Sequence, residues 1–132
     1  STLMPHIFNF EIYYEDTDMG GIVYYANYLK FIERARSSLI NVLGIDQLGL
    51  SLDGVFFVVR DLSAEFLAPA RMGDKLRVET DVLSVTHVRM ILQQNVWRKK
   101  HLIFRSKVTI VLIDSDGKPK KLPAKIRQIS QL

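Results

Sequence analysis

The chain has 132 residues with 48% hydrophobic and 24% charged side chains and a net charge of +4, which favours one packed domain over residues 1–132 and excludes wholesale disorder. The absence of cysteine excludes a disulfide framework, a thiolate nucleophile and an iron–sulfur cluster, and three histidines are too few for a histidine-rich metal site. No apolar stretch approaches the ~20 residues of a membrane span and no signal-peptide pattern opens the chain, so we expect a soluble, cytoplasmic protein.

The pattern predicts a short strand over residues 6–13. Apolar side chains alternate there with polar ones, as in a strand with one buried face. Residues 14–24 break the alternation with acids, a threonine and the glycine pair Gly20–Gly21. We expect these residues to form a loop.

A long helix is predicted next, because apolar residues recur at spacings of three and four and share one stripe. That stripe consists of Tyr28, Phe31, Ile32, Ala35, Leu39, Val42 and Leu43. We expect Asn27 to be the N-cap, with its side-chain oxygen accepting a free backbone N–H. Gly44 is expected to end the helix in a left-handed conformation. Off the stripe, Glu33 and Arg36 have the spacing of an ordinary ion pair, structural or intersubunit.

The remainder of the chain predicts four strands in succession. They cover residues 55–67, 76–82, 88–97 and 102–113, and the second of them shows the cleanest alternation. We expect Arg98–His101 to be a hairpin turn and Asp114–Gly117 to be a second turn. Residues 123–131 are expected to form a last short helix that begins at Pro123.

This order of elements predicts an α+β domain. Short connections favour an antiparallel meander of about five strands, with the long helix burying its stripe against one face. Such a sheet leaves edge strands exposed, and we therefore expect the chain to oligomerise.

Residues 13–28 hold the most informative chemistry, because acids and a glycine pair directly precede a helix N-terminus. Unpaired N–H groups at such a terminus bind a developing oxyanion, while a nearby carboxylate attacks or activates water. Glycines allow a substrate to approach the main chain closely. The alternative is that Asp16 and Asp18 only cap the loop and the helix.

This segment reads Y-Y-E-D-T-D-x-G-G-x-V-Y-x-A-x-Y and is followed by F-x-E-R-A-R, by Phe57–Arg60 and by Ala64–Arg71. In this pattern the chain closely resembles the hotdog-fold thioesterases of the 4-hydroxybenzoyl-CoA thioesterase family and, within them, the Tol-Pal-associated acyl-CoA thioesterases. The resemblance implies a bent antiparallel sheet wrapped around one long helix. It also implies a homodimer with one continuous sheet, either alone or paired with a second dimer as a homotetramer, and active sites at the dimer interface.

The resemblance further implies an enzyme that hydrolyses acyl-CoA thioesters to free acid and CoA without a metal or another cofactor. Asp18 matches the family's catalytic carboxylate, which acts either as the nucleophile or as general base for water. The backbone N–H of Tyr25 matches the group that polarises the thioester carbonyl, and Tyr14 matches a tyrosine implicated at the site. The Tol-Pal-associated branch usually has histidine at the position of Tyr25. Here Tyr25 either lines an acyl pocket or donates a hydrogen bond through its hydroxyl.

Substrate-binding residues are implied at several further places. The loop contributes Gly21, Val23 and Tyr24, and the strand after the helix contributes Phe57 and Val58, which are otherwise core or interface residues. His87 and Arg89 lie in the hairpin where the 4-hydroxybenzoyl enzyme clusters basic residues against the CoA phosphates. Five lysines either add point charges to that cluster or, as we favour, belong to solvated turns: Lys99, Lys100, Lys118, Lys120 and Lys121.

The charge of the chain is unevenly distributed. Residues 1–85 hold 7 basic and 12 acidic side chains, giving −5, whereas residues 86–132 hold 11 and 2, giving +9. The basic half is either a solvated surface or a patch that attracts a polyanion. We do not expect a nucleic acid as partner, because the aromatic residues form no stacking platform on a strand. The basic half also leaves open an alternative function, in which the chain is an interaction module for acyl carrier protein or a membrane-associated partner.

Overall fold

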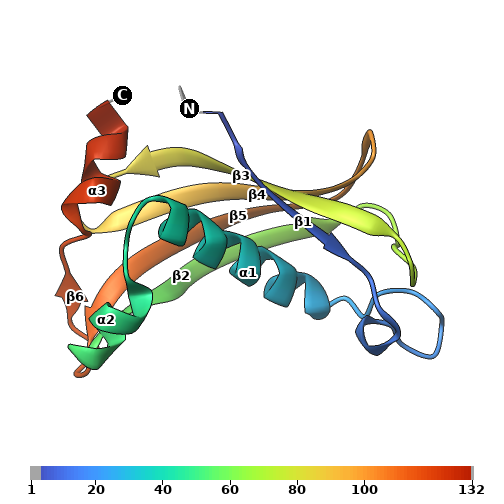
Figure 1. Ribbon diagram of the computed structural model, residues 1–132, viewed down its shortest axis with the longest axis horizontal. Helices are drawn as coiled ribbons and strands as arrows, with labels where there is room; N and C mark the ends of the chain where they lie inside the picture. The colour runs from blue at the N-terminus through green and yellow to red at the C-terminus, as the bar shows by residue number, and fades with distance from the viewer. Residues whose placement is uncertain (1–3, 132) are drawn as a thin grey trace.

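The computed structural model describes residues 4–131, and it shows a strongly curved antiparallel sheet packed around one long helix (Figure 1). The strands are β1 (His6–Glu11), β2 (Val55–Phe66), β3 (Lys75–Val85), β4 (Arg89–Arg98), β5 (His101–Asp114) and β6 (Pro119–Lys120). The helices are α1 (Asn27–Val42), α2 (Gln47–Leu52), α3 (Ala124–Arg127) and the 3₁₀ turns η1 (Tyr14–Asp16) and η2 (Gln128–Gln131). None of the helices in this described range is long and apolar enough to cross a membrane.

The sheet has six strands in the order β1-β3-β4-β5-β2, with β6 paired to the end of β5. The predicted α+β class is confirmed, and β3, β4 and β5 form the expected meander. The meander does not extend to β2, which pairs with β5 and not with β3, its successor in sequence. As a result β1 and β2 both lie at edges of the main sheet.

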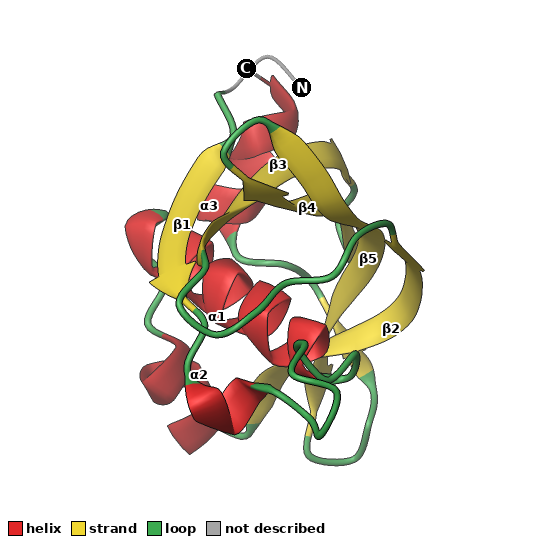
Figure 2. Ribbon diagram, turned by 90° about the vertical axis from the view of Figure 1, so that its right-hand side faces the viewer, coloured by secondary structure: helices red, strands yellow, loops and turns green. Residues whose placement is uncertain are grey.

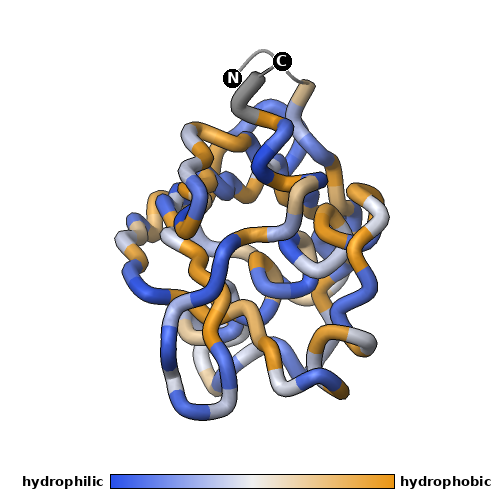
Figure 3. Tube along the Cα trace, turned by 90° about the vertical axis from the view of Figure 1, so that its left-hand side faces the viewer, coloured by the Kyte–Doolittle hydropathy of each residue, from blue (hydrophilic) through white to orange (hydrophobic). Residues whose placement is uncertain are grey.

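Helix α1 lies inside the curve of the sheet, as the end-on view shows (Figure 2). Most of the predicted stripe is buried, but Val42 is 72% exposed and Ile40, outside that stripe, is only 3% exposed. Ile40 is buried because the sheet wraps far enough around α1 to bring Ile110 of β5 to the same cavity. Hydrophilic and hydrophobic segments follow one another along the chain (Figure 3), and the buried residues of β3, β4 and β5 give the sheet an apolar face toward α1.

The observed ends of α1 agree only in part with the ends predicted from the sequence. Gly44 has a positive φ of 83° and follows the helix as expected. Asn27 is not the N-cap: that position is held by Ala26, whose side chain makes no capping bond. Asn27 is instead the first helical residue, and its amide nitrogen is used to bond the carbonyl oxygen of Asp16. The short α2 that follows was not predicted, although Asp46 caps it by accepting from the Gly49 N–H.

Two turns and the last helix are close to their predicted places. Arg98 and His101 pair with each other, so the β4–β5 turn is confined to Lys99 and Lys100. The turn at 114–117 forms, with the Gly117 N–H bonded to the Asp114 carbonyl at 2.9 Å. Helix α3 begins at Ala124 with Pro123 as its N-cap, and η2 continues it to residue 131.

A buried amide fixes α1 on the sheet. Gln94 of β4 has no exposed surface, and its Nε2 donates to the Ile32 carbonyl at 2.9 Å and to the Thr80 hydroxyl at 3.0 Å. Its Oε1 accepts from Nη1 of Arg36 at 2.9 Å. Arg36 therefore bonds to Gln94, and in the single chain it forms no ion pair with Glu33. Burial lowers the pKa of Arg36, and the negative charge of Glu33 acts in the opposite direction.

Replacing this amide with an apolar side chain should destabilise the fold. In Gln94→Leu the Arg36 guanidinium and the Thr80 hydroxyl lose a buried partner. We therefore expect the free energy of unfolding, measured in urea, to be about 2–3 kcal/mol lower than for the natural sequence. Gln93→Leu is the matched control, because Gln93 points to the opposite face of the same strand, and we expect a change within about 0.5 kcal/mol. Equal losses in both variants would contradict the anchoring role of Gln94.

Candidate active site

The loop that carries Asp18 is a tight, hydrogen-bonded turn. Thr17 and Val23 form an antiparallel bridge that closes it. Within the turn, the Asp18 N–H donates to the Ile22 carbonyl at 2.9 Å and the Gly21 N–H donates to the Asp18 carbonyl at 3.0 Å. Gly21 has a φ of 78°, a left-handed conformation that explains why glycine is found at this position.

Within the described residues, only one of the two oxygens of the Asp18 carboxylate accepts a hydrogen bond. Its Oδ1 accepts a hydrogen bond from the Gly20 N–H at 2.8 Å, which fixes the orientation of the side chain. Among the described residues none donates to Oδ2, and the side chain is exposed in the single chain. One oxygen of Asp18 is therefore oriented by the protein and the other is available to a ligand or a water molecule.

The start of α1 is tied to the same loop through the backbone carbonyl of Asp16. This oxygen accepts from the Tyr24 N–H at 3.0 Å and from the Asn27 side-chain amide at 2.9 Å. The Asp16 carboxylate also accepts from the Tyr13 N–H at 2.9 Å, so its side chain braces the loop. The spacing of the sequence did not reveal the Asn27 bond, because it joins residues 11 positions apart.

Two backbone donors are left free where α1 begins. The N–H groups of Asn27, Tyr28 and Leu29 donate to carbonyls three residues earlier. Within residues 4–131, neither the Tyr25 N–H nor the Ala26 N–H has a hydrogen-bond acceptor. These two donors lie at the positive end of the helix dipole, where a negatively charged oxygen is stabilised.

The segment between β2 and β3 is hydrogen-bonded to the Asp18 loop. The Val23 N–H donates to the Ala70 carbonyl at 2.8 Å, and Ile22 forms a bridge with Arg71. Val23 is only 5% exposed and is part of the core, whereas Tyr24, the next residue, faces outward. The predicted residues Asp18, Gly21, Val23 and Tyr24 thus lie in one structural unit.

A series of aromatic rings connects the exposed site to the core. Tyr25 packs against Tyr24 at 5.0 Å between ring centroids and meets the edge of Phe66 at 5.9 Å. Phe66 in turn lies 5.8 Å from Tyr28, which is stacked on Phe104 at 4.8 Å. Burial raises the pKa of the Tyr28 hydroxyl, so that it stays neutral. Phe66 was not predicted as a site residue, since it lies far from the loop in sequence.

Tyr14 lies on η1, and its side chain is 79% exposed. Its carbonyl accepts from both the backbone N–H and the hydroxyl of Thr17, at 3.0 and 2.7 Å. The phenol itself projects from the loop that carries Asp18.

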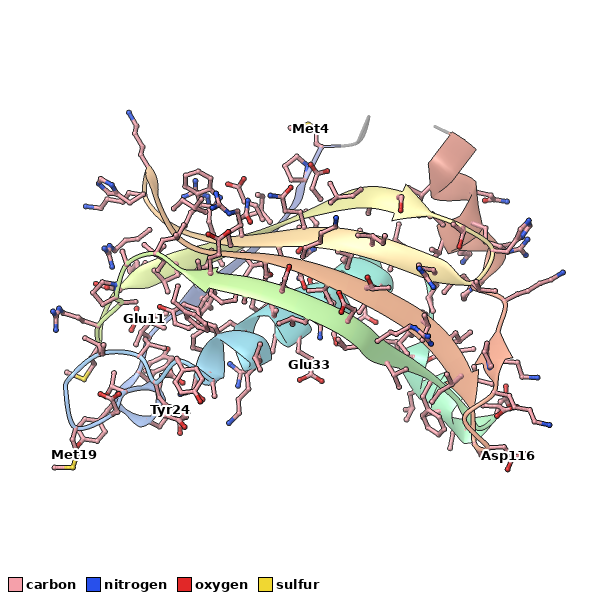
Figure 4. All side chains as sticks on the ribbon, turned by 180° about the vertical axis from the view of Figure 1, so that it is seen from behind. Met4, Glu11, Met19, Tyr24, Glu33 and Asp116 are labelled. Carbon is pink, nitrogen blue, oxygen red and sulfur yellow. The ribbon has the colours of Figure 1, made fainter. Side chains whose placement is uncertain are left out.

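The other predicted substrate-binding residues lie at the opposite end of the molecule from the Asp18 loop. Phe57 and Val58 are near the start of β2, and nine residues of extended strand, about 30 Å, separate Phe57 from Phe66. His87 and Arg89 lie at the β3–β4 turn, where the His87 carbonyl accepts from the Leu122 N–H. Figure 4 shows the two ends of the molecule, with Met19 and Tyr24 at one and Asp116 at the other.

Phe57, Val58 and Val59 border a cavity of about 150 Å³ between β2 and α1. Glu33, Arg36 and Ser37 border it on the helix side, so the cavity combines an apolar wall with two opposite charges. It opens beside the edge strand β2. In the single chain the predicted site residues therefore form two separate groups, one at the Asp18 loop and one at the start of β2 and the β3–β4 turn.

Comparison with known proteins gives consistent matches. Residues 20–104 match the family model described as "Thioesterase superfamily". The acyl-CoA thioester hydrolase YbgC of Escherichia coli O6:H1 is 37% identical over 117 residues, which is 87% of each chain. The acyl-CoA thioesterase YbgC of Haemophilus influenzae is 34% identical over 91% of this chain and 90% of its own length. A crystal structure of a probable thioesterase from Bartonella henselae superposes with a TM-score of 0.86 at 34% identity, covering 90% of this chain and 99% of that one.

The bond between Asn27 and Asp16 should determine how rigid the loop is. In Asn27→Ala the Asp16 carbonyl keeps only the Tyr24 N–H, and we expect hydrogen exchange at the amides of residues 17–24 to speed up about tenfold. Asn41→Ala is the control, because Asn41 is exposed near the other end of the same helix. Unchanged exchange in the Asn27 variant would contradict the role of this side chain in holding the loop.

Proposed function

The chain belongs to the thioesterase superfamily, and from this premise we propose that it hydrolyses acyl-CoA, with Asp18 as nucleophile or general base. The family match confirms the predicted thioester hydrolase and the predicted hotdog fold. The observation that supports Asp18 is its geometry: Oδ1 accepts from the Gly20 N–H, no described residue donates to Oδ2, and the loop is tied to the start of α1 by the bond from Asn27 to the Asp16 carbonyl.

The proposed reaction begins with the thioester carbonyl oxygen near the Tyr25 N–H, with the neighbouring Ala26 N–H as a second donor. These donors stabilise the negative charge that develops on the oxygen when the carbonyl is attacked. If Asp18 attacks, a mixed anhydride forms and CoA leaves as a thiolate; water then hydrolyses the anhydride. If Asp18 is the base, it removes a proton from the attacking water and that proton passes to the sulfur. Both routes yield the free acid and CoA without a metal or another cofactor.

Tyr25 has a second role in this proposal, because its ring packs between Tyr24 and Phe66 at the surface. We assign these rings to the wall that the acyl group contacts next to the thioester. Tyr14 projects from the same loop and is assigned to the entrance of the site.

A second copy of the chain would complete the site. The outer edge of β2 is free, since β5 is its partner in the sheet, and Phe56, Val59 and Phe66 along it are at least 40% exposed. Twofold pairing of two β2 strands in antiparallel directions joins the sheets and places the start of one strand beside the end of the other. Phe57 and Val58 of the partner subunit then approach Tyr25, and the partner's His87 and Arg89 lie toward the same end.

We further propose that two such dimers form a tetramer through the outer face of the sheet. In the described chain, buried side-chain atoms of Asp81, Asn95 and Trp97 have no hydrogen-bond partner, and a second layer against that face would supply partners. We place the enzyme in the cytoplasm, where acyl-CoA is available.

Asp18→Asn should abolish turnover while preserving the fold. The amide keeps an oxygen for the Gly20 N–H but can neither attack the thioester nor accept a proton, so we expect kcat with acyl-CoA to fall at least about 100-fold. The measurement is steady-state hydrolysis of an acyl-CoA panel that spans short, long and aromatic acyl groups.

Glu15→Gln is the control for Asp18, because Glu15 is an exposed carboxylate on the same loop, and its kcat should stay within about twofold. Undiminished turnover in the Asp18 variant, with normal circular dichroism and mass, would remove Asp18 from the mechanism. Tight binding of an acyl carrier protein by a natural chain that hydrolyses no thioester would support the alternative function of an interaction module.

The proposed β2 contact can be tested by crosslinking, since the chain has no cysteine of its own. A single cysteine near the midpoint of β2, introduced as Arg60→Cys or Asp61→Cys, lies close to its own copy across a twofold axis and should form an intermolecular disulfide under mild oxidation. Asn9→Cys tests the other edge strand, β1, and should remain monomeric on a non-reducing gel. Crosslinking of the Asn9→Cys variant but not of the β2 variants would show that the dimer forms through β1, and it would contradict the proposed β2 contact.

A further inference from the structure

A half-buried ion pair joins the β4–β5 hairpin to the 69–74 segment, which lies between β2 and β3. Nη1 of Arg98, the last residue of β4, donates to Oδ2 of Asp74 at 3.1 Å and to the Pro69 carbonyl at 2.8 Å. The two charged side chains are 30% and 28% exposed. The hairpin turn, the 69–74 segment and the Asp18 loop lie at the same end of the molecule (Figure 1). Neither Arg98 nor Asp74 was predicted as a site residue.

The Asp74 carboxylate also fixes the path of its own segment. Its Oδ2 accepts from the Arg71 N–H at 2.9 Å, and the Asp74 N–H donates back to the Arg71 carbonyl at 3.0 Å. One carboxylate oxygen therefore receives both a cation and a main-chain donor. Among the described residues, Arg98 is the one residue outside the 69–74 segment whose side chain bonds to it.

The Asp18 loop is attached to the middle of this segment. The Val23 N–H donates to the Ala70 carbonyl at 2.8 Å, and Ile22 forms a bridge with Arg71. Ala70 has no exposed surface, so the attachment lies in the packed interior. A displacement of the 69–74 segment is therefore passed to the loop through backbone hydrogen bonds.

The same ion pair lies close to the first turn of α1. Burial raises the pKa of the Tyr28 hydroxyl, and the charge of Arg98 lowers that pKa while the charge of Asp74 raises it. Both charges therefore act at Tyr28, whose N–H donates to the Tyr25 carbonyl at 3.3 Å. The pair thus lies between the two parts of the candidate site, the loop and the helix start.

We propose that Arg98 and Asp74 are positioning residues for thioester hydrolysis, because their ion pair sets where the Asp18 loop lies relative to the start of α1. This inference rests on the proposed reaction at Asp18. The two side chains act through the backbone of the 69–74 segment and of residues 22–23. A displacement of about 1 Å in a reacting group costs on the order of 100-fold in rate, so a loosened loop lowers kcat more than it weakens binding.

The first test is Arg98→Gln, in which the cation and its two bonds are lost. We expect kcat to fall about tenfold and KM to stay within about threefold, because the loop moves while the surfaces that bind the substrate remain. Asp74→Asn is the conservative variant, since its amide oxygen still accepts from Arg71 and Arg98, and we expect kcat to fall only about threefold. The measurement is steady-state hydrolysis of the acyl-CoA that the natural protein turns over fastest.

Arg77→Gln is the matched control. Arg77 is 32% exposed, pairs with Glu79 at 2.8 Å and donates to the Lys99 carbonyl at 2.6 Å, but it makes no bond to the 69–74 segment. The melting temperatures of the two Gln variants should therefore agree within about 3 °C. In contrast to Arg98→Gln, the control should keep its kcat within about twofold of the natural protein.

A second measurement needs no substrate. Hydrogen exchange at the Val23 N–H should be about tenfold faster in Arg98→Gln and unchanged in Arg77→Gln. A kcat in Arg98→Gln within twofold of the natural value overturns the proposal, as does an equal fall of kcat in the control or a rise in KM at unchanged kcat. Unchanged exchange at Val23 overturns it as well. Failure of the proposed function has a different signature, which is full turnover by Asp18→Asn.

Discussion

One carbonyl oxygen, that of Asp16, joins the two parts of the candidate site. It receives the Tyr24 N–H and the Asn27 amide, and these bonds hold the turn of Asp18 against the start of α1. The carboxylate follows Asp16 by two residues, and the free N–H of Tyr25 follows Tyr24 by one. The carboxylate proposed as nucleophile or general base and the proposed oxyanion donor therefore share one anchor, and their separation depends on bonds that a substrate does not have to form. Preorganisation of this kind lowers the cost of reaching a reactive geometry.

The fold was predictable wherever periodicity was strong and local. The alternation in residues 76–82 and the three-and-four spacing in residues 28–39 each identify a buried face, and the structure has a strand and a helix there. The position of β2 next to β5 was not predictable, because sheet order depends on contacts between distant strands. Ile40 was left out of the predicted stripe because a curved sheet covers more of a helix than a flat one does, whereas Val42 was placed on the stripe and is exposed at the last position of α1. A six-residue helix such as α2 has too few turns for a periodic signal.

The candidate site divides in the same way. Asp18, Gly21, Val23 and Tyr24 were predicted together because one short motif contains them, and the structure places them in one turn. Phe66 carries no local mark, and it reaches Tyr25 only because β2 ends beside the start of α1. Asn27 was predicted to be the N-cap, which is wrong: an asparagine before a helix is typical of an N-cap, and only tertiary structure shows that its amide points to Asp16.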